Sequence, residues 1–146
     1  MGKIIYTAEA QVTGGRANGR GRTAGGELDI ELRFPKELGG AGDGLNPEQL
    51  FAVGYAACFE STMALVAPRL QLSAEDASID SKVMLITRED AGYQLGVKLE
   101  ITLPSVADPG QAAALVRTAH QICPYSNATR GNIDVEFVVN GTPLEG

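Results

Sequence analysis

One long apolar segment constrains the fold of this chain more than any other feature. Residues 48–67, EQLFAVGYAACFESTMALVA, carry large apolar side chains that together sweep around a helix axis rather than forming one stripe. Asn46, Pro47 and Glu48 are typical of a helix start: a side-chain cap, a preset φ and a carboxylate near the positive helix end. A helix that is apolar on nearly every side is expected to be buried centrally or packed against a second subunit.

The segments around this helix predict an α+β fold. Alternating or β-branched patterns predict strands within residues 4–12, 28–34, 77–89, 93–104 and 133–139. The third and fourth of these are expected to form a hairpin through residues 90–92. Asp108 and Pro109 precede a second predicted helix, residues 110–122, which ends near Cys123. Antiparallel strands with two main helices are therefore expected.

Composition narrows the classes of function. The 146 residues contain no repeat or linker, which predicts one domain, 1–146. A net charge of −6 disfavours binding to nucleic acid. The apolar runs fall short of the roughly 20 residues of a membrane span, so no membrane insertion is expected. The N-terminal residues lack the apolar core of a signal peptide, so we expect a cytoplasmic protein.

Few side chains are available for metal binding or hydrolysis. The two cysteines lie 65 positions apart and His120 is the one histidine, so the sequence does not predict a zinc site. No G-x-S-x-G motif is present. His120 is more typical of a helix C-terminal residue that satisfies carbonyl groups than of a catalyst.

The two cysteines allow more than one interpretation. Cys58 lies in the apolar stretch YAACF, where a thiol usually packs as a small, inert side chain. Reactivity would require a nearby cation that lowers its pKa, and Arg16 in the GGRANG turn is one candidate. Cys123 follows the second predicted helix and is either a resolving thiol or a packed helix end.

Four strings carry a family resemblance: TGGR, LGG, NPEQLFAVGYAACF and HQICPYSNATRGNIDV, in this order and spacing. With them the chain resembles the organic hydroperoxide resistance (Ohr) proteins of the OsmC/Ohr superfamily over about residues 4–139. The resemblance implies an OsmC/Ohr-like α+β fold, an intertwined homodimer and a thiol peroxidase activity. It also implies a lipoylated protein as electron donor, acting through dihydrolipoamide, and no bound cofactor.

Matched position by position, the resemblance assigns roles to four residues. Cys58 matches the peroxidatic cysteine and Cys123 the resolving cysteine, while Arg16 matches the arginine that activates the thiolate and Glu48 the carboxylate that orients it. Leu50, Phe51 and Phe59 would then form apolar walls that favour an alkyl or lipid hydroperoxide. Each of these three is equally typical of ordinary core.

The spacing of Glu48 and Cys58 adds a geometric condition. Ten residues on one unbroken helix separate them by roughly 15 Å along the axis. Either the helix is broken near Gly54, or Glu48 serves the cysteine of a partner subunit, and we hypothesise the second. Two other functions also stay open: a redox sensor or binding protein on the same scaffold, and a ligand-binding structural protein with inert thiols.

Overall fold

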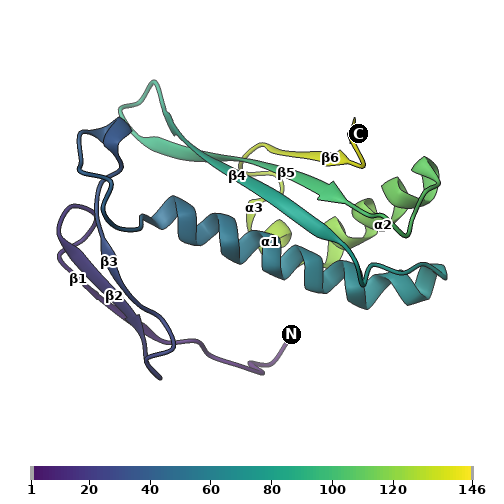
Figure 1. Cartoon of the computed structure of the whole chain (residues 1–146), viewed down its shortest axis with the longest axis horizontal. Helices are drawn as coiled ribbons and strands as arrows, with labels where there is room; N and C mark the ends of the chain where they lie inside the picture. The colour runs from purple at the N-terminus through teal and green to yellow at the C-terminus, as the bar shows by residue number, and fades with distance from the viewer. Residues whose placement is uncertain (1, 146) are drawn as a thin grey trace. The chain divides into compact units, whose positions relative to one another are not determined.

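The computed structural model describes residues 2–145 and divides into two compact units, residues 1–50 and 51–146. The N-terminal unit is a three-stranded antiparallel meander in the order β1-β2-β3 (Figure 1). Its elements are β1 (Ala10–Thr13), β2 (Gly19–Thr23), β3 (Asp29–Leu32) and the short 3-10 helix η1 (Lys36–Leu38). The C-terminal unit contains a four-stranded sheet and most of the helical residues.

The N-terminal meander differs from the sequence prediction at two places. The strand expected over residues 4–12 begins only at Ala10, and Ile4 and Ile5 are 85% and 87% exposed. Strand β2, with the sequence GRGRT, was not predicted, because glycine and arginine have little intrinsic strand preference. It forms because both of its edges pair, with β1 on one side and β3 on the other.

Glycine at position 14 makes the turn between β1 and β2 possible. Its φ is +76°, and a Cβ there would lie 2.2 Å from the carbonyl oxygen of Asn18. Only glycine fits this close backbone approach. The turn carries Arg16 at its tip.

Helix α1 (Pro47–Val66) begins and runs as the sequence predicts. The Asn46 side chain accepts a hydrogen bond from the Gln49 N–H (2.9 Å), and the Gln49 side chain accepts one from the Asn46 N–H (3.0 Å). This reciprocal pair is a capping box. The helix continues into the 3-10 helix η2 (Ala67–Leu70). The helical segment Pro47–Leu70 is long and apolar enough to cross a membrane, but the core helices of soluble proteins share this length and composition.

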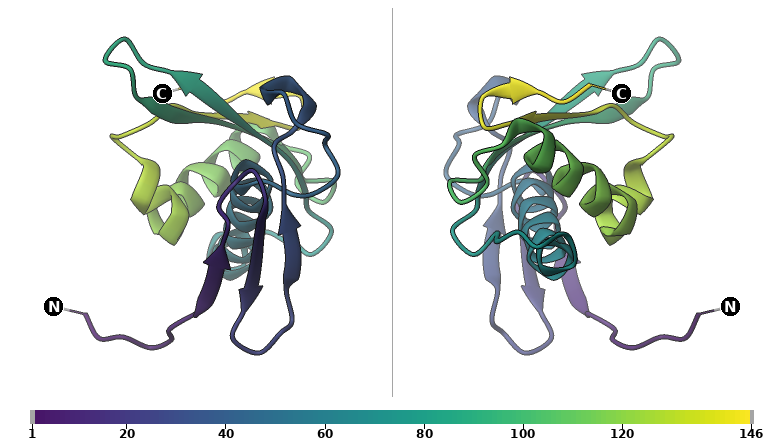
Figure 2. Two further views of the ribbon diagram at one scale, coloured as in Figure 1. Left: turned by 90° about the vertical axis from the view of Figure 1, so that its left-hand side faces the viewer. Right: turned by 90° about the vertical axis from the view of Figure 1, so that its right-hand side faces the viewer.

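The C-terminal unit has the strand order β4-β5-β6-β7, with α1 and α2 lying on the same face of its sheet (Figure 2). Its further elements are β4 (Ser78–Thr87), β5 (Tyr93–Thr102), α2 (Pro109–Ile122), α3 (Pro124–Thr129), β6 (Val135–Val139) and β7 (Thr142–Pro143). The expected hairpin is confirmed as the antiparallel β4–β5 pair. The short helix α3 and strand β7 were not predicted.

One strand pair corrects the expectation of antiparallel sheets. Strands β5 and β6 pair in parallel, with Val97 opposite Val135 and Ile101 opposite Val139. Parallel neighbours need a crossover connection, and here it is made by α2 and α3. The two cysteine positions lie on α1 and at the α2–α3 junction, so this crossover decides where they meet.

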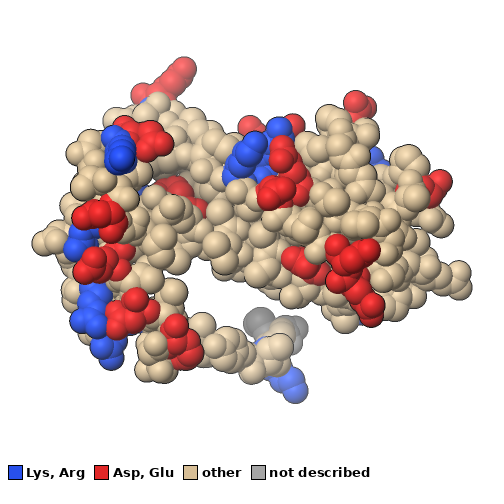
Figure 3. Space-filling view, viewed as in Figure 1, with Lys and Arg blue, Asp and Glu red and all other residues tan. Residues whose placement is uncertain are grey.

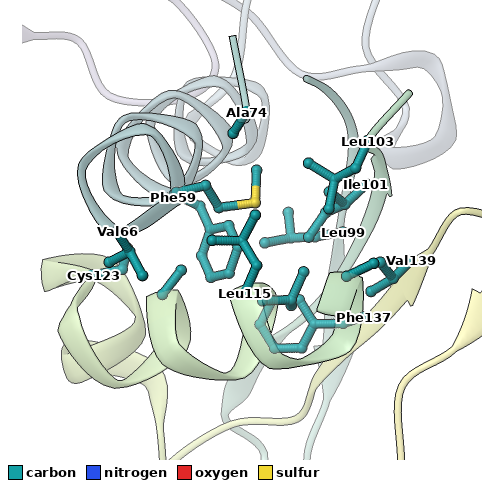
Figure 4. Close-up of a cluster of buried hydrophobic side chains, with 14 of the residues drawn as sticks. Phe59, Val66, Ala74, Leu99, Ile101, Leu103, Leu115, Cys123, Phe137 and Val139 are labelled. Atoms are coloured by element: carbon teal, nitrogen blue, oxygen red, sulfur yellow. The ribbon is translucent and has the colours of Figure 1, made fainter. Parts of the chain in front are cut away.

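The core fills the space between the sheet and the two helices (Figure 4). Alternate residues of β5, among them Leu99 and Ile101, are almost completely buried. Phe59 of α1 lies with its ring 5.2 Å from that of Phe137 on β6. Each such side chain contributes roughly 1.5–3 kcal/mol when it is fully buried. The face of α1 that carries Phe59 is therefore fixed firmly against the sheet.

A buried polar contact fixes α3 to α1. The Tyr55 hydroxyl lies 2.8 Å from the hydroxyl of Ser126 and 3.2 Å from that of Thr129. The Tyr55 side chain is 0% exposed, so its hydroxyl group obtains its hydrogen bonds from α3. This contact positions the first turn of α3 next to α1.

We expect Tyr55→Phe to lower the free energy of unfolding by about 1–2 kcal/mol, because it leaves buried hydroxyls on α3 without their partner. The measurement is urea unfolding at a fixed protein concentration. Tyr93→Phe is the matched control, since Tyr93 is 69% exposed and its hydroxyl forms no hydrogen bond with residues 2–145. Equal losses in the two variants would contradict this role of the hydroxyl.

Candidate functional site

The two cysteines meet in the C-terminal unit. Cys58 projects from the middle of α1, and Cys123 stands between the end of α2 and the start of α3. Their sulfur atoms lie 3.6 Å apart, with the Cys123 thiol donating to Cys58, and both are free thiols. A disulfide needs about 2.0 Å between the sulfurs. A small displacement would therefore join them.

Local sequence explains the position of Cys123. Its backbone N–H donates to the carbonyl oxygen of Ala119 (2.8 Å), which closes the last turn of α2. Pro124 then occupies the first position of α3, where a missing N–H costs nothing. The cysteine is held rigidly between two helices, and its side chain is 0% exposed.

Cys58 differs from Cys123 in burial and hydrogen bonding. Its side chain is half-buried at the edge of the core. Burial raises the pKa of the Cys58 thiol above its ordinary value, and the backbone N–H of Tyr125, which donates to the sulfur, opposes this rise. The neighbouring Cys123 thiol raises the pKa further. Within this unit the thiol is therefore accessible but only weakly acidic.

Arg16 and Glu48 form a second pair, in the N-terminal unit. Nη1 and Nη2 of Arg16 donate to the two carboxylate oxygens of Glu48 at 2.9 and 2.6 Å. The Arg16 guanidinium lowers the pKa of Glu48 below its ordinary value, against the opposing effect of burial. A bidentate pair of this kind fixes the plane of the guanidinium. Arg16 is thus an oriented cation and not a freely solvated turn residue.

Two further arginines near this turn, Arg20 and Arg33, are also paired. Arg20 donates to both carboxylate oxygens of Asp29, at 2.8 and 2.6 Å, and Arg33 lies 3.7 Å from Glu31. On the face shown in Figure 3, basic and acidic side chains alternate over the three-stranded unit. The glycine- and arginine-rich run therefore does not form a continuous basic strip on that face.

Helix α1 is unbroken through Gly54, so a break there does not explain the spacing of Glu48 and Cys58. Gly54 has a different role: a Cβ at this position would lie 2.6 Å from the hydroxyl oxygen of Tyr125. Glycine lets the Tyr125 ring pack directly on the helix. The second explanation, in which Glu48 serves a partner subunit, stays a prediction.

The predicted apolar wall residues have different surroundings. Phe51 is half-buried, with its ring 5.8 Å from that of Tyr125, and it lines a cavity of ≈ 760 Å³ beside α3. Phe59 is fully buried in the core and does not line this cavity. Leu50 is half-buried at the end of the N-terminal unit.

Sequence reasoning missed Tyr125. Its N–H contacts the Cys58 sulfur and its ring lines the cavity. Its place two residues after Cys123, directly behind a proline that can start a helix, was a signal that could have identified it.

His120 lies in the last turn of α2, as the sequence suggests. Its ring packs edge-on against Phe137 at 4.9 Å, and its buried Nδ1 has no hydrogen-bond partner among the described residues. Burial lowers its pKa, and the charge of Arg130 lowers it further. Within residues 2–145, no group of three or more His, Cys, Asp or Glu side chains is placed to hold a metal ion.

Comparisons with known proteins identify the family of this chain. A family model described as OsmC-like protein matches residues 40–138. The organic hydroperoxide resistance protein of Xanthomonas axonopodis pv. citri is 53% identical over 140 residues, which cover 94% of this chain and 96% of that protein.

Two crystal structures match nearly the whole chain. An organic hydroperoxide resistance protein from Legionella pneumophila has a TM-score of 0.88 at 48% identity, covering 94% of this chain and 98% of that one. A putative organic hydroperoxide resistance protein from Vibrio cholerae, with captopril in one of its active sites, has a TM-score of 0.90 at 43% identity. It covers 97% of this chain and 96% of that one. The resemblance drawn from the cysteine segments is confirmed: this chain belongs to the OsmC-like family, among the organic hydroperoxide resistance proteins.

Proposed function

We propose that this chain is a cysteine-based peroxidase that reduces organic hydroperoxides to alcohols. The observation that carries the proposal is the pair of free thiols, one half-buried and one fully buried, with sulfur atoms 3.6 Å apart. The names of the relatives support the class of substrate. Cys58 is the peroxidatic residue because it is the accessible member of the pair.

The reaction balances with two thiols and one external dithiol. The Cys58 thiolate attacks the terminal oxygen of R–O–OH, the O–O bond breaks, and the alkoxide takes up a proton and leaves as R–OH. Cys58 is oxidised to a sulfenic acid. The Cys123 sulfur then attacks the Cys58 sulfur, water leaves, and a disulfide forms. A dithiol, which we propose to be dihydrolipoamide on a lipoylated protein, reduces the disulfide by thiol exchange.

The raised pKa of Cys58 makes a nearby cation necessary. Burial disfavours the thiolate, and one N–H donor offsets only part of this cost. Arg16, oriented by Glu48, would stabilise the thiolate and polarise the peroxide. The chemistry needs no metal, flavin or haem. We propose that it takes place in the cytoplasm, where a dithiol donor is available.

The surface of α1 supports a homodimer. Residues 53, 57, 61 and 65 form an i, i+4 stripe whose members are all exposed, including Val53 at 70% and Leu65 at 57%. A central apolar helix with such an exposed stripe favours packing against the same helix of a second chain. In this dimer Arg16 and Glu48 of one chain would approach Cys58 of the other, which meets the spacing condition on α1. The Vibrio cholerae protein has captopril bound in one of its active sites, which is compatible with two sites per dimer.

We expect Cys58→Ser to reduce the turnover of cumene hydroperoxide with dihydrolipoamide to the uncatalysed rate, because the nucleophile is lost. Cys123→Ser should consume one equivalent of peroxide, give a sulfenic acid that dimedone traps, and lose turnover with dithiols. Peroxide consumption and mass spectrometry measure both. Equal, slow consumption by wild type and Cys58→Ser would contradict the peroxidase; unimpaired turnover in Cys123→Ser would remove its resolving role. Stoichiometric oxidation of wild type without turnover would indicate a redox sensor.

The pH dependence of Cys58 alkylation tests Arg16. In a Cys123→Ser background only Cys58 reacts, and its alkylation rate rises with pH as the thiolate forms. Arg16→Gln should move the midpoint upward by roughly one pH unit or more, because the cation that stabilises the thiolate is gone. Glu48→Gln should move it in the same direction by less. Arg20→Gln is the matched control, since Arg20 also forms a bidentate carboxylate pair. Identical midpoints for Arg16→Gln and Arg20→Gln would exclude this role of Arg16.

Subunit mixing tests the site shared between chains. Arg16→Gln and Cys58→Ser chains, refolded together, should regain activity that neither has alone, because each mixed dimer contains one complete site. Random association of a two-site dimer predicts roughly a quarter of wild-type activity. Recovery no greater than the sum of the separate variants would place Arg16 and Cys58 of one chain in one site.

A further inference from the structure

The cavity beside α3 is lined by residues next to Cys123 in the sequence. Pro124 and Tyr125 line it, and these two residues directly follow Cys123. The backbone N–H of Tyr125 also donates to the Cys58 sulfur. A molecule whose peroxide reaches Cys58 can therefore place its organic group in this space.

Apolar and aromatic side chains dominate the rest of the lining. The cavity measures ≈ 760 Å³, within the range of about 300–1,000 Å³ that is usual for small-molecule sites. Its walls come from α1, from α3 and the turn that follows it, and from the hairpin end of β5, and include Phe51, Tyr93, Leu95, Ala128 and Ile133. Such walls suit a hydrocarbon chain.

One charged residue, Arg88, is among the lining residues. It lies in the turn between β4 and β5, where its backbone N–H donates to the Gly92 carbonyl (2.8 Å) and its carbonyl accepts from the Ala91 N–H (3.2 Å). Two backbone hydrogen bonds thus fix the position of this residue in the turn. The hairpin end of the cavity therefore carries a guanidinium group.

The Arg88 guanidinium keeps donors free for a ligand. Its Nη2 donates to Asp90 at 2.8 Å, which is the one side-chain hydrogen bond of Arg88 within the described part of the chain. A guanidinium has five N–H donors, so most remain available. The Arg88 side chain is 50% exposed, so an anion can reach it.

We propose that Arg88 is a specificity-determining residue that binds the anionic group of an amphiphilic organic hydroperoxide. The alkyl chain fills the apolar cavity, and the carboxylate accepts hydrogen bonds from the guanidinium in the planar geometry that arginine favours. The anionic group takes no part in the redox step, so the electron and proton balance is that given above. The proposal rests on the proposed peroxidase function.

The consequence is a preference for a free acid over its ester. A carboxylate and its methyl ester have the same chain and the same hydroperoxide, but only the carboxylate has a charge for Arg88 to bind. The two substrates therefore separate the contribution of Arg88 from that of the apolar walls.

The experiment compares kcat/KM for linoleic acid hydroperoxide and its methyl ester, below their micelle concentrations. Wild type should favour the free acid. Arg88→Gln should reduce the acid-to-ester ratio of kcat/KM roughly threefold to tenfold, chiefly through KM, because it removes a charge-assisted hydrogen bond at a half-exposed site. Sodium chloride should weaken the acid preference of wild type and have little effect on that of Arg88→Gln.

Arg69→Gln is the matched control, because it removes the same charge from an exposed arginine on η2 that does not line the cavity. It should keep the wild-type ratio. An unchanged ratio in Arg88→Gln, an equal fall in both variants, or a wild-type preference that salt does not alter would each overturn the role of Arg88. Failure of the peroxidase itself is distinguished separately, by the loss of Cys58-dependent turnover with cumene hydroperoxide.

Discussion

The packing of one face of α1 against β5 and α2 is the constraint on which the thiol site depends. Tyr55, Phe59, Met63 and Val66 are completely buried along this face. Their burial fixes the rotation of the helix, and the rotation decides where Cys58 points. The crossover through α2 returns the chain to the same side of the sheet and delivers Cys123 to within 3.6 Å of Cys58.

Burial of the Cys58 sulfur has two opposing effects on this site. A partly enclosed sulfur lies beside apolar walls that can hold an organic group, but enclosure raises the pKa of the thiol. The Tyr125 N–H recovers part of that cost without adding a charge. A guanidinium held in a plane by a carboxylate could supply the rest, and the Arg16–Glu48 pair has this geometry. In this interpretation α1 contributes one residue to the thiol pair and one to the ion pair, because Cys58 and Glu48 project from different turns of one continuous helix.

The regular elements were largely predictable because their signals are local. The Asn46 cap, the β4–β5 hairpin and the Asp108 cap of α2 each depend on residues close in sequence, and all three are present. Strand β2 and the parallel β5–β6 pair were not predictable in this way. Strand β2 forms through pairing on both edges, and the direction of β6 depends on the path of the chain through α2 and α3.

Residue types alone establish the chemical groups of this protein: two thiols, one histidine, an arginine in a glycine-rich turn and a carboxylate at a helix start. Together with the spacing of the cysteine segments, this identified the family. Folding of the chain brings Tyr125 to the Cys58 sulfur and Phe59 into the core, and it places an aromatic ring on Gly54 and Arg88 beside the cavity. The reason is physical: residue type limits what a side chain can do, but its neighbours, burial and pKa depend on segments that are distant in sequence and meet only on folding.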